Sequence, residues 1–410
     1  MGIVLFDEKE KCCGCGACLN VCPKNAISMK PDKEGFLYPF IDKGRCIECG
    51  LCKKSCNYQE VNYLQEPISA YAAVNKNEEQ LFKSASGGVF SAIATQFLKE
   101  GGVVYGATLE FNDGYVNPHH IEVTSIDELY KLQGSKYVQS MIDDCYKKAQ
   151  IHLENGKKVL FSGTPCQIAG LYGYLKKYYE NLWTIDVICH GVPNAQFFND
   201  FINNESKKKN ASVIGYCFRD KTKGWGLNGR IDFKYPSGKV KSFYTLARLS
   251  SYYTFFLNGD IYRENCYSCP YARKERVSDI TIGDYWGIRK EQSELLNKEE
   301  YDENKGISCA LVNTEKGKKL FEGMGKWICL DKSSYEKISR GNGQLKKPSD
   351  ESKIRNYILN MYVTEGYEKL DKWYKRKNRK KLIAYRMYRM IPTKLRLKIK
   401  YIALNFKTKL

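Results

Sequence analysis

The chain has 410 residues, of which 43% are hydrophobic and 13% are aromatic. At a typical ~100 to 200 residues per domain, this length suggests a small module plus a body of one or two domains, and the apolar content excludes bulk disorder. The formal charge is +20, but residues 371–410 carry 15 Lys or Arg against the single acid Asp371. The excess of basic charge therefore belongs to the tail, and we expect no nucleic-acid partner.

The beginning of the chain does not resemble a secretion signal. The segment MGIVLFDEKEK turns acidic after six residues, and no apolar run approaches the ~20 residues that a membrane-spanning helix requires. We therefore expect a soluble, cytoplasmic protein. The basic tail leaves a peripheral contact with the inner face of the membrane open as an alternative.

Nine of the 17 cysteines fall within residues 12–56, which favours metal ligation over disulfides. Two runs share the spacing C-x2-C-x2-C-x3-C that is typical of bacterial ferredoxins. The runs consist of Cys12, Cys15, Cys18 and Cys22, followed by Pro23, and of Cys46, Cys49, Cys52 and Cys56, followed by Asn57. This pattern predicts an α+β ferredoxin-type module over residues 1–60 that holds two [4Fe-4S] clusters.

The fourth cysteine of each run is expected to serve the other cluster. One predicted cluster has the ligands Cys12, Cys15, Cys18 and Cys56, and the other has Cys46, Cys49, Cys52 and Cys22. A pair of zinc sites is the alternative, although zinc usually takes two separated C-x2-C pairs. Cys13 is expected to be a small packing residue.

The order strand, turn, helix recurs after a polar linker near residues 58–68. YAAVN and GGVVYGATL read as strands that flank a helix at 89–99, and KKVLFSG and LWTIDVICHG are strands that each precede a helical segment. This alternation predicts an α/β body with a mixed sheet, beginning with a lobe over residues 68–183. Glycine-separated strands predict a second, α+β lobe over 184–346. A helical basic tail is expected over 351–410.

Two turns of the first lobe have the composition of an anion site. Ser84, Ser86, Gly87 and Gly88 precede the helix at 89–99, and Gly163 and Thr164 begin the turn GTPCQIAG. Backbone amides at a helix N-terminus bind phosphate, and two such turns at the carboxyl ends of strands suit a dinucleotide cofactor. A plain Ser cap followed by glycines is the alternative.

Six further motifs carry a resemblance: SASGGVFSAI, QGSKYVQS, GTPCQIAGL, DVICHGVP, FRDKTKGW and ENCYSCPYARKERVSDITIGDYWGI. Together with the ferredoxin run, they make residues 1–345 similar to the coenzyme F420 hydrogenase/dehydrogenase beta-subunit family. Members are flavin and iron-sulfur reductases, so the resemblance implies FAD. It implies contacts with the cofactor at Ser86, Gly87, Gly88, Lys136 and Tyr137, and Lys136 would stabilise negative charge on the reduced ring or the pyrophosphate.

Two histidine-containing segments have several interpretations. His190 in ICHGVP could donate a proton to a substrate, because histidine titrates near neutral pH, or it could cap a turn. Lys136, introduced above as a cofactor contact, could instead be a solvated surface lysine. His190 and Lys136 are therefore only weak candidates for a catalytic role. His119 and His120 have no ligand spacing and are expected at the surface.

A third [4Fe-4S] cluster is expected in the body, with Cys166, Cys189, Cys266 and Cys269 as its ligands. Cys166 and Cys189 follow consecutive strands, and CYSCP places two thiolates on one loop. Loops after consecutive parallel strands emerge at the same edge of a sheet, so these cysteines should lie near the flavin turn. A structural turn or half of a zinc site is the alternative.

These features predict an iron-sulfur flavoprotein oxidoreductase that passes electrons from the ferredoxin-type clusters to FAD and on to an organic acceptor. The alternative is an electron-transfer beta subunit that docks on a hydrogenase or dehydrogenase and has no substrate of its own. In either case we expect a redox partner protein, either a ferredoxin or a dehydrogenase subunit.

The tail is predicted to bind a surface. Leu395, Ile399, Ile402 and Phe406 share one face of a helix, and basic residues lie mostly elsewhere around it. Deletion of residues 371–410 should abolish co-sedimentation with anionic liposomes and keep the cofactors. Unchanged sedimentation would refute lipid binding and favour the alternative, in which this face docks on the body.

Overall fold

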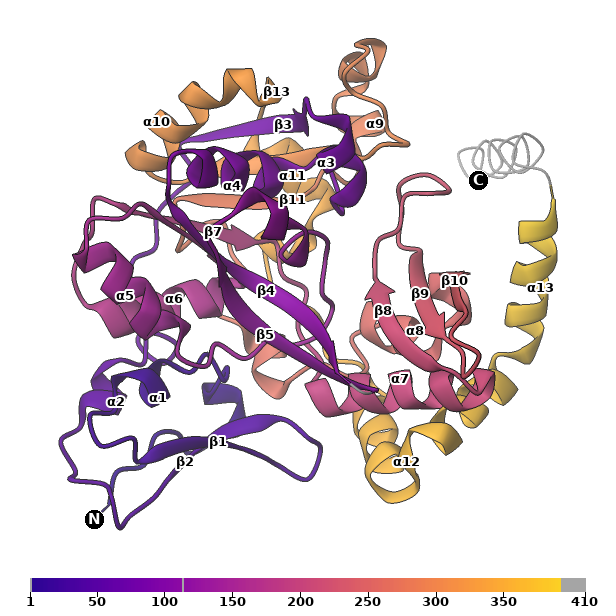
Figure 1. The fold of residues 1–410 in the computed structure, drawn as a ribbon, viewed down its shortest axis with the longest axis horizontal. Helices are drawn as coiled ribbons and strands as arrows, with labels where there is room; N and C mark the ends of the chain where they lie inside the picture. Colours follow the sequence, from indigo (N-terminus) through magenta and orange to yellow (C-terminus); the bar gives the residue numbers. More distant parts are fainter. Residues whose placement is uncertain (1, 113, 392–410) are drawn as a thin grey trace.

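The computed structural model describes residues 2–112 and 114–391, and its strands form three sheets (Figure 1). A two-stranded sheet joins β1 (Ile27–Pro31) and β2 (Leu37–Ile41). The large sheet contains β3 (Ser69–Asn75), β4 (Val103–Asn112), β5 (Tyr115–Val123), β6 (Val159–Gly163), β7 (Leu182–Val187), β11 (Ile280–Asp284), β12 (Ser308–Val312) and β13 (Ile328–Ser333). A three-stranded sheet joins β8 (Ser212–Cys217), β9 (Gly229–Lys234) and β10 (Val240–Thr245).

The helices are distributed along the whole described chain. They are α1 (Ala17–Val21), α2 (Leu51–Lys54), α3 (Glu78–Lys83), α4 (Val89–Lys99), α5 (Cys145–Glu154), α6 (Pro165–Leu175), α7 (Ala195–Lys209), α8 (Ser251–Leu257), α9 (Ile288–Glu291), α10 (Glu315–Glu322), α11 (Tyr335–Gly341), α12 (Arg355–Lys377) and α13 (Arg379–Met390). None of the helices in this part of the chain has the length and apolar character needed to cross a membrane.

The N-terminal module has the expected α+β form. β1 and β2 pair antiparallel, and each cysteine run continues into a short helix, α1 or α2. Both helices begin directly after a glycine with positive φ, Gly16 at 76° and Gly50 at 72°, a conformation that L side chains rarely adopt. The cysteine spacing and the glycines therefore act together to wrap each run into a tight loop followed by a helical turn.

The eight-stranded sheet is mixed and has the strand order β13-β3-β12-β11-β7-β6-β4-β5. Its centre is parallel, because β4, β6, β7 and β11 pair parallel, and the remaining pairs are antiparallel. The predicted boundary between residues 183 and 184 falls inside β7, and strands from both sides of that boundary share the sheet. The division of the body at this point is therefore wrong, because pairing of β7 with the distant β11 continues the sheet across it.

Both faces of the large sheet are covered. Val103 and Tyr105 on β4 belong to the buried cluster that also contains residues of α5 and α6, whereas Val104 packs with residues of α4. This alternation follows from the two-residue period of a strand. The sheet therefore forms the middle layer of an α/β body, as the strand and helix order predicts.

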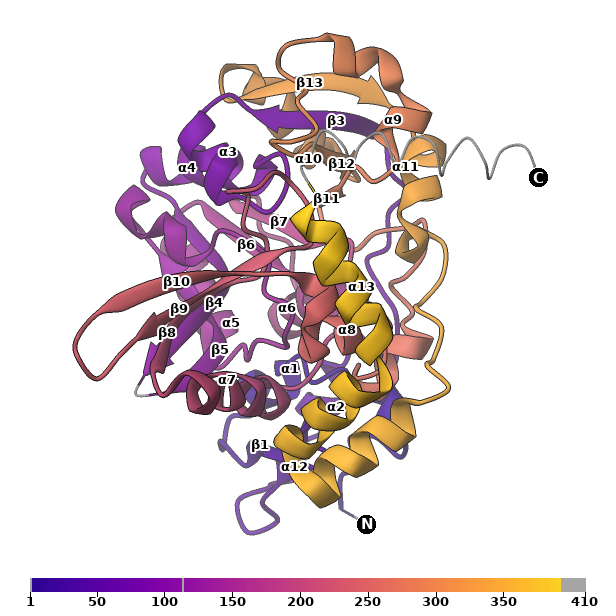
Figure 2. The ribbon, with the colours of Figure 1, turned by 90° about the vertical axis from the view of Figure 1, so that its right-hand side faces the viewer.

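A buried cluster around the three-stranded sheet, called the second lobe below, includes part of the predicted tail. Ile358, Leu370 and Tyr374 of α12 are buried in the same cluster as residues of α7, α8 and β9. The ribbon of α12 lies next to α7 and α8 (Figure 2). Asp371 is also buried and accepts hydrogen bonds from Ser251 at 2.7 Å and Lys208 at 2.8 Å.

This packing corrects the predicted start of a separate tail. The stretch from residue 355 to residue 377 belongs to the lobe, so a test of lipid binding has to remove residues beyond it. The predicted apolar face at Leu395, Ile399, Ile402 and Phe406 lies outside the described residues.

The ferredoxin module packs against α6 of the body, and two helix glycines make room for it. A Cβ at Gly173 would lie 2.2 Å from the carbonyl oxygen of Ser55, and one at Gly170 would lie 2.9 Å from Cys15 Sγ. Asn57 donates a hydrogen bond to the carbonyl oxygen of Ala169 at 3.1 Å. The backbone of α6 therefore contacts the cysteine loops of the module directly.

Replacement of Gly173 with Ala should loosen this contact. The added methyl group would collide with backbone rather than with a mobile side chain, so we expect a loss of roughly 1 to 3 kcal/mol in stability. The effect is measured as a lower Tm and faster proteolysis in the linker at 58–68. Gly323→Ala is the control, because nothing lies within 4 Å of a Cβ built there. Equal behaviour of the two variants would contradict the close packing.

Candidate functional site

Four cysteines of the module surround a small cavity at its outer end. Cys22, Cys46, Cys49 and Cys52 all line this cavity, and Cys49 is exposed to solvent. Cys22 comes from the first run and reaches the other three across the module. This is the set of side chains that the ferredoxin spacing predicts for one cluster.

The second predicted set of the module lies closer to the body. Burial raises the pKa of Cys18, and the neighbouring thiols of Cys15, Cys12 and Cys56 raise it further. Burial likewise raises the pKa of Cys12, which also interacts with Cys15 and Cys56. The four side chains therefore lie close enough to affect one another electrostatically. Metal binding would deprotonate these thiols.

The four cysteines predicted for the third cluster also meet around one cavity. Cys166 lies in the first turn of α6 after β6, and Cys189 follows β7. Cys266 and Cys269 lie in and directly after a 3-10 turn, Glu264–Ser268. The backbone N–H of Arg263 donates to the carbonyl oxygen of Val192 at 2.9 Å, which joins the last loop to the turn that follows β7.

Cys13 lies between the module and this third set. Its thiol is buried, lines the same cavity, and is in hydrogen-bond contact with both Cys15 and Cys166. In the described part of the chain, no three His, Cys, Asp or Glu side chains are arranged to hold a metal ion. The twelve cysteines nevertheless fall into three neighbouring groups, as the two cavities and the mutual effects of the Cys12, Cys15, Cys18 and Cys56 thiols show, and their role as ligands stays a prediction.

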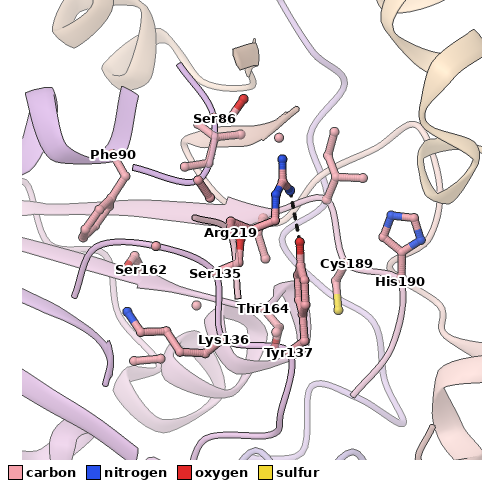
Figure 3. A pocket seen from close by; sticks show the side chains of 18 of the residues that line it. Ser86, Phe90, Ser135, Lys136, Tyr137, Ser162, Thr164, Cys189, His190 and Arg219 are labelled. Atoms are coloured by element: carbon pink, nitrogen blue, oxygen red, sulfur yellow. Dashed lines mark hydrogen bonds between the residues drawn. The ribbon is translucent and has the colours of Figure 1, made fainter. Parts of the chain in front are cut away.

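The main cavity of the body has a volume of about 420 Å³. It lies between the second lobe and the carboxyl ends of β6, β7 and β11. Figure 3 shows Lys136 and Phe90 on one side of it, Cys189 and His190 on the opposite side, and Tyr137 and Arg219 between them. This is the edge of a parallel sheet at which α/β proteins bind ligands.

The cavity shares a wall with the third group of cysteines. The shared residues are Thr164, Cys166, Cys189, His190, Gly191 and Val192. Cys166 and Cys189 therefore face both spaces. A group bound in the main cavity would be a direct neighbour of whatever these thiols hold.

The N-terminus of α4 borders the cavity with free backbone donors. Ser84, Gly88, Val89 and Phe90 line this side, and no side chain caps the helix at Gly88. The first N–H groups of a helix have no partner within it, so they can bind an anion.

Two residues of this turn that were predicted to contact the cofactor make other contacts within the protein. Ser86 lines the cavity, but its hydroxyl donates to the carbonyl oxygen of Ile307 at 2.9 Å. Gly87 does not line it, and a Cβ there would lie 2.3 Å from the carbonyl oxygen of Ala73. Gly87 therefore serves close packing of the turn on β3.

The second predicted turn is closed by its own side chains. Thr164 and Gln167 form a reciprocal capping box at the start of α6, and the Thr164 hydroxyl also lies 3.1 Å from Cys166 Sγ. Gly163 and Thr164 both line the cavity. This turn therefore positions Cys166 and has fewer free donors than the start of α4.

Lys136 and Tyr137 extend into the cavity from the segment GSKYVQS. The Lys136 Nζ donates to the carbonyl oxygen of Gln133 at 2.8 Å, and burial lowers the pKa of this amine to about 7. Tyr137 stacks on Phe256 with ring centroids 4.5 Å apart. Lys136 is therefore a cation that can lose its proton near neutral pH.

Arg219 connects the second lobe to the large sheet, and the sequence did not indicate its role. Its guanidinium binds both carboxylate oxygens of Asp284 at 2.8 and 3.0 Å and donates to the Tyr137 hydroxyl at 3.0 Å. Trp225 stacks on Trp286 beside this pair, with centroids 4.4 Å apart. The motifs FRDKTKGW and IGDYWG contain these residues, so the resemblance was the available signal.

The expectation for His120 was wrong. Its side chain is 2% exposed, lines the cavity, and stacks on Phe161 with centroids 5.7 Å apart. Burial lowers the pKa of His120 to about 4, so the ring is neutral at physiological pH. The sequence analysis expected a surface position because His119 and His120 have no ligand spacing with other residues. His190 is more exposed and lies at the wall shared by the two cavities, where partial burial also lowers the pKa of its ring.

Comparison with protein families identifies three matching regions. Coenzyme F420 hydrogenase/dehydrogenase, beta subunit N-term, matches residues 70–146, and the C terminus of the same beta subunit matches residues 156–337. A 4Fe-4S dicluster domain matches residues 11–59 and supports the predicted module. The junction of the two beta-subunit regions near residue 150 differs from the predicted boundary at 183.

Two curated relatives come from Methanocaldococcus jannaschii. A coenzyme F420-dependent sulfite reductase is 30% identical over 162 residues, which are 39% of this chain and 24% of that protein. The chain thus spans about a quarter of the length of this relative. An uncharacterized ferredoxin is 36% identical over 56 residues, which are 14% of this chain and 71% of the ferredoxin.

A solved structure is also similar. It is a chain of the F420-reducing [NiFe] hydrogenase complex from Methanosarcina barkeri, with 14% identity and a TM-score of 0.39. The match covers 77% of this chain and 94% of that one. At this TM-score, the likeness supports no conclusion.

The lowered pKa of Lys136 predicts how the effect of the Lys136→Met substitution on Tm changes with pH. The pKa of the folded state, about 7, lies below the usual 10.5, so burial of the charge costs most below pH 7. This cost is lost as the pH rises toward 10. The Tm gain of Lys136→Met over wild type should therefore be largest below pH 7 and should shrink between pH 7 and 10. Lys157→Met, at an exposed position, should show no such trend; a constant Tm difference for Lys136→Met would contradict the burial of the ammonium group.

Proposed function

Because the chain belongs to the coenzyme F420 hydrogenase/dehydrogenase beta-subunit family, we propose that it is an iron-sulfur flavoprotein oxidoreductase. Electrons enter at the ferredoxin-type clusters, reach FAD in the main cavity, and leave with an organic acceptor. We assign no particular acceptor to this chain, because coenzyme F420 appears only in the names of the family and of the relatives.

The observation that carries this proposal is the wall shared by two cavities. Cys166 and Cys189 face the group of four cysteines on one side and the 420 Å³ cavity on the other. A [4Fe-4S] cluster held by these four thiolates would border the flavin site with no intervening layer of side chains. Electron transfer between them would need no movement of the protein.

The contact between the module and the body supports a continuous path. Cys15 packs on α6 at Gly170, and Cys13 contacts both Cys15 and Cys166. The inner group of the module and the third group are therefore separated by one buried thiol. The outer group includes the exposed Cys49, which suits the entry of electrons from a redox partner protein such as a ferredoxin or a dehydrogenase subunit.

The residues of the cavity fit FAD in three respects. The uncapped start of α4 offers N–H donors to a pyrophosphate, the aromatic rings of Phe90 and Tyr137 offer flat apolar surface, and Lys136 supplies a cation. FAD, when bound, converts one-electron transfer from clusters into two-electron chemistry with an organic substrate. Ser86, Gly163 and Thr164 line the cavity and would contact the cofactor directly. Gly87 would not contact it and would instead allow the turn to pack on β3.

Two side chains of the cavity are suited to proton handling. Lys136 can hold a proton at its Nζ and release it near pH 7, since burial lowers its pKa to about 7. His190 lies at the opposite side, beside Cys189, and is exposed to solvent. We propose that Lys136 balances negative charge inside the cavity and that His190 exchanges protons with water at its mouth.

Cofactor analysis of anaerobically purified protein tests the proposal. At four irons per cluster, three clusters predict about twelve irons per chain, with one FAD. Cys269→Ala should lose roughly a third of the iron, because it removes a ligand of the third cluster only. Cys145→Ala is the matched control, since this buried cysteine lies on α5, outside the three groups, and should keep all of the iron.

The possible results separate the alternatives. About eight irons with FAD would remove the third cluster from the proposal and keep the flavoprotein. About twelve irons without FAD would contradict the flavoprotein and favour an electron-transfer subunit that docks on a hydrogenase or dehydrogenase. Equal iron loss in the two cysteine variants would contradict the assignment of ligands.

A further inference from the structure

Arg263 is a fully buried cation without a carboxylate partner. Its relative exposure is 0%, and within the described residues no Asp or Glu oxygen lies within 4.0 Å of its guanidinium. The other large buried arginines differ in this respect. Arg276 binds Asp186 at 2.9 Å, and Arg355 lies 3.8 Å from both Glu34 and Glu264.

The guanidinium of Arg263 contacts the first cysteine of the module instead. Nε donates to the carbonyl oxygen of Cys12 at 2.9 Å, and Nη2 lies 3.9 Å from Cys12 Sγ. The group also stacks over the Tyr38 ring, with the central carbon 3.9 Å from the ring centroid. A Cβ at Gly14 would lie 3.3 Å from the guanidinium carbon, so the glycine permits this close approach.

The backbone of Arg263 belongs to the loop that carries the third group of cysteines. Its N–H donates to the carbonyl oxygen of Val192, and its carbonyl oxygen accepts from the N–H of Cys266 at 3.0 Å. The side chain therefore reaches from the third group to the first cysteine of the inner group. Its charge acts on the thiols of both groups, Cys12 and Cys266.

A buried charge is costly unless an anion balances it. The anion nearest to this guanidinium would be the Cys12 thiolate of an iron-sulfur cluster. We propose that Arg263 raises the reduction potential of the inner cluster, held by Cys12, Cys15, Cys18 and Cys56, above that of the outer cluster. This proposal rests on the proposed function.

The consequence is a direction for the electron inside the module. The step is the transfer of one electron from the outer cluster, which is oxidised, to the inner cluster, which is reduced, and no bond or proton changes place. Net positive charge and hydrogen bonds near the sulfurs stabilise the reduced form of a cluster. Arg263 would thus hold the electron at the end of the module that faces Cys13 and the body, as a positioning residue for charge rather than a catalytic residue.

Redox titration of the intact protein, followed by electron paramagnetic resonance, tests the proposal. Arg263→Gln removes the charge and keeps hydrogen-bond donors, so the potential of one module cluster should shift to a more negative value. Arg263→Lys keeps the charge and should restore the potential toward wild type. Iron content should stay the same in both variants.

Arg355→Gln is the matched control. This residue is 2% exposed and also buried near the module, but it donates to the carbonyl oxygen of Tyr262 and lies near two carboxylates. Its loss should leave the cluster potentials unchanged. The proposal would be overturned if the potentials were unchanged in Arg263→Gln, or if Arg263→Lys shifted them as much as Arg263→Gln does. If the wild-type protein showed no iron-sulfur signals at all, the proposed function itself would be wrong.

A measurement on wild-type protein decides the matter if Arg263→Gln cannot be purified with its clusters. Protein labelled with ¹⁵N-arginine should show weak coupling of a guanidinium nitrogen to one reduced cluster in pulsed electron paramagnetic resonance. Coupling to a single cluster supports the contact with Cys12. If no cluster showed coupling to a guanidinium nitrogen, the proposed role of Arg263 would be overturned.

Discussion

The contact between the ferredoxin module and α6 is the constraint on which the site depends. Gly170 and Gly173 leave the helix without side chains where Cys15 and the Ser55 backbone approach it. The same helix carries Cys166 in its first turn, so one rigid element touches both the module and the body's cysteines. Close-packed backbones have few alternative arrangements. A larger residue on this face would separate the groups that the proposed electron path requires to be neighbours.

The buried arginines have two different environments. Some form ion pairs that connect elements of the fold, and one lies next to the cysteines. Arg219 joins the second lobe to β11 through both oxygens of Asp284. Arg276, which precedes β11, donates to Thr281 of β11 and to Asp186 of β7. Breaking a buried pair of this kind leaves an uncompensated charge and costs about 3 to 5 kcal/mol. Arg263 has cysteine and tyrosine neighbours instead of a carboxylate, so its charge would be available to the thiolates of the proposed inner cluster.

Local patterns predicted the elements near the site well and their long-range assembly poorly. The strand at YAAVN, the helix at 89–99 and the strand-turn-helix units at KKVLFSG and LWTIDV all agree with the structure. The boundary at 183 failed because β7 pairs with β11, almost 100 residues later. The tail starts later than the predicted residue 351, because Ile358, Leu370 and Tyr374 pack into a core formed by elements far away in the sequence.

The sequence by itself indicated the iron-sulfur chemistry of the N-terminal module, because cysteine spacing is a local property and x2 loops bring thiolates together whatever the rest of the chain does. It also indicated that the turns after two strands carry Cys166 and Cys189, since the helix and strand periods are local too. Only the tertiary structure decided which of these turns meet, that His120 is buried and neutral, and that Arg263 faces Cys12. Such relations depend on contacts between residues far apart in the chain, and no local period encodes them.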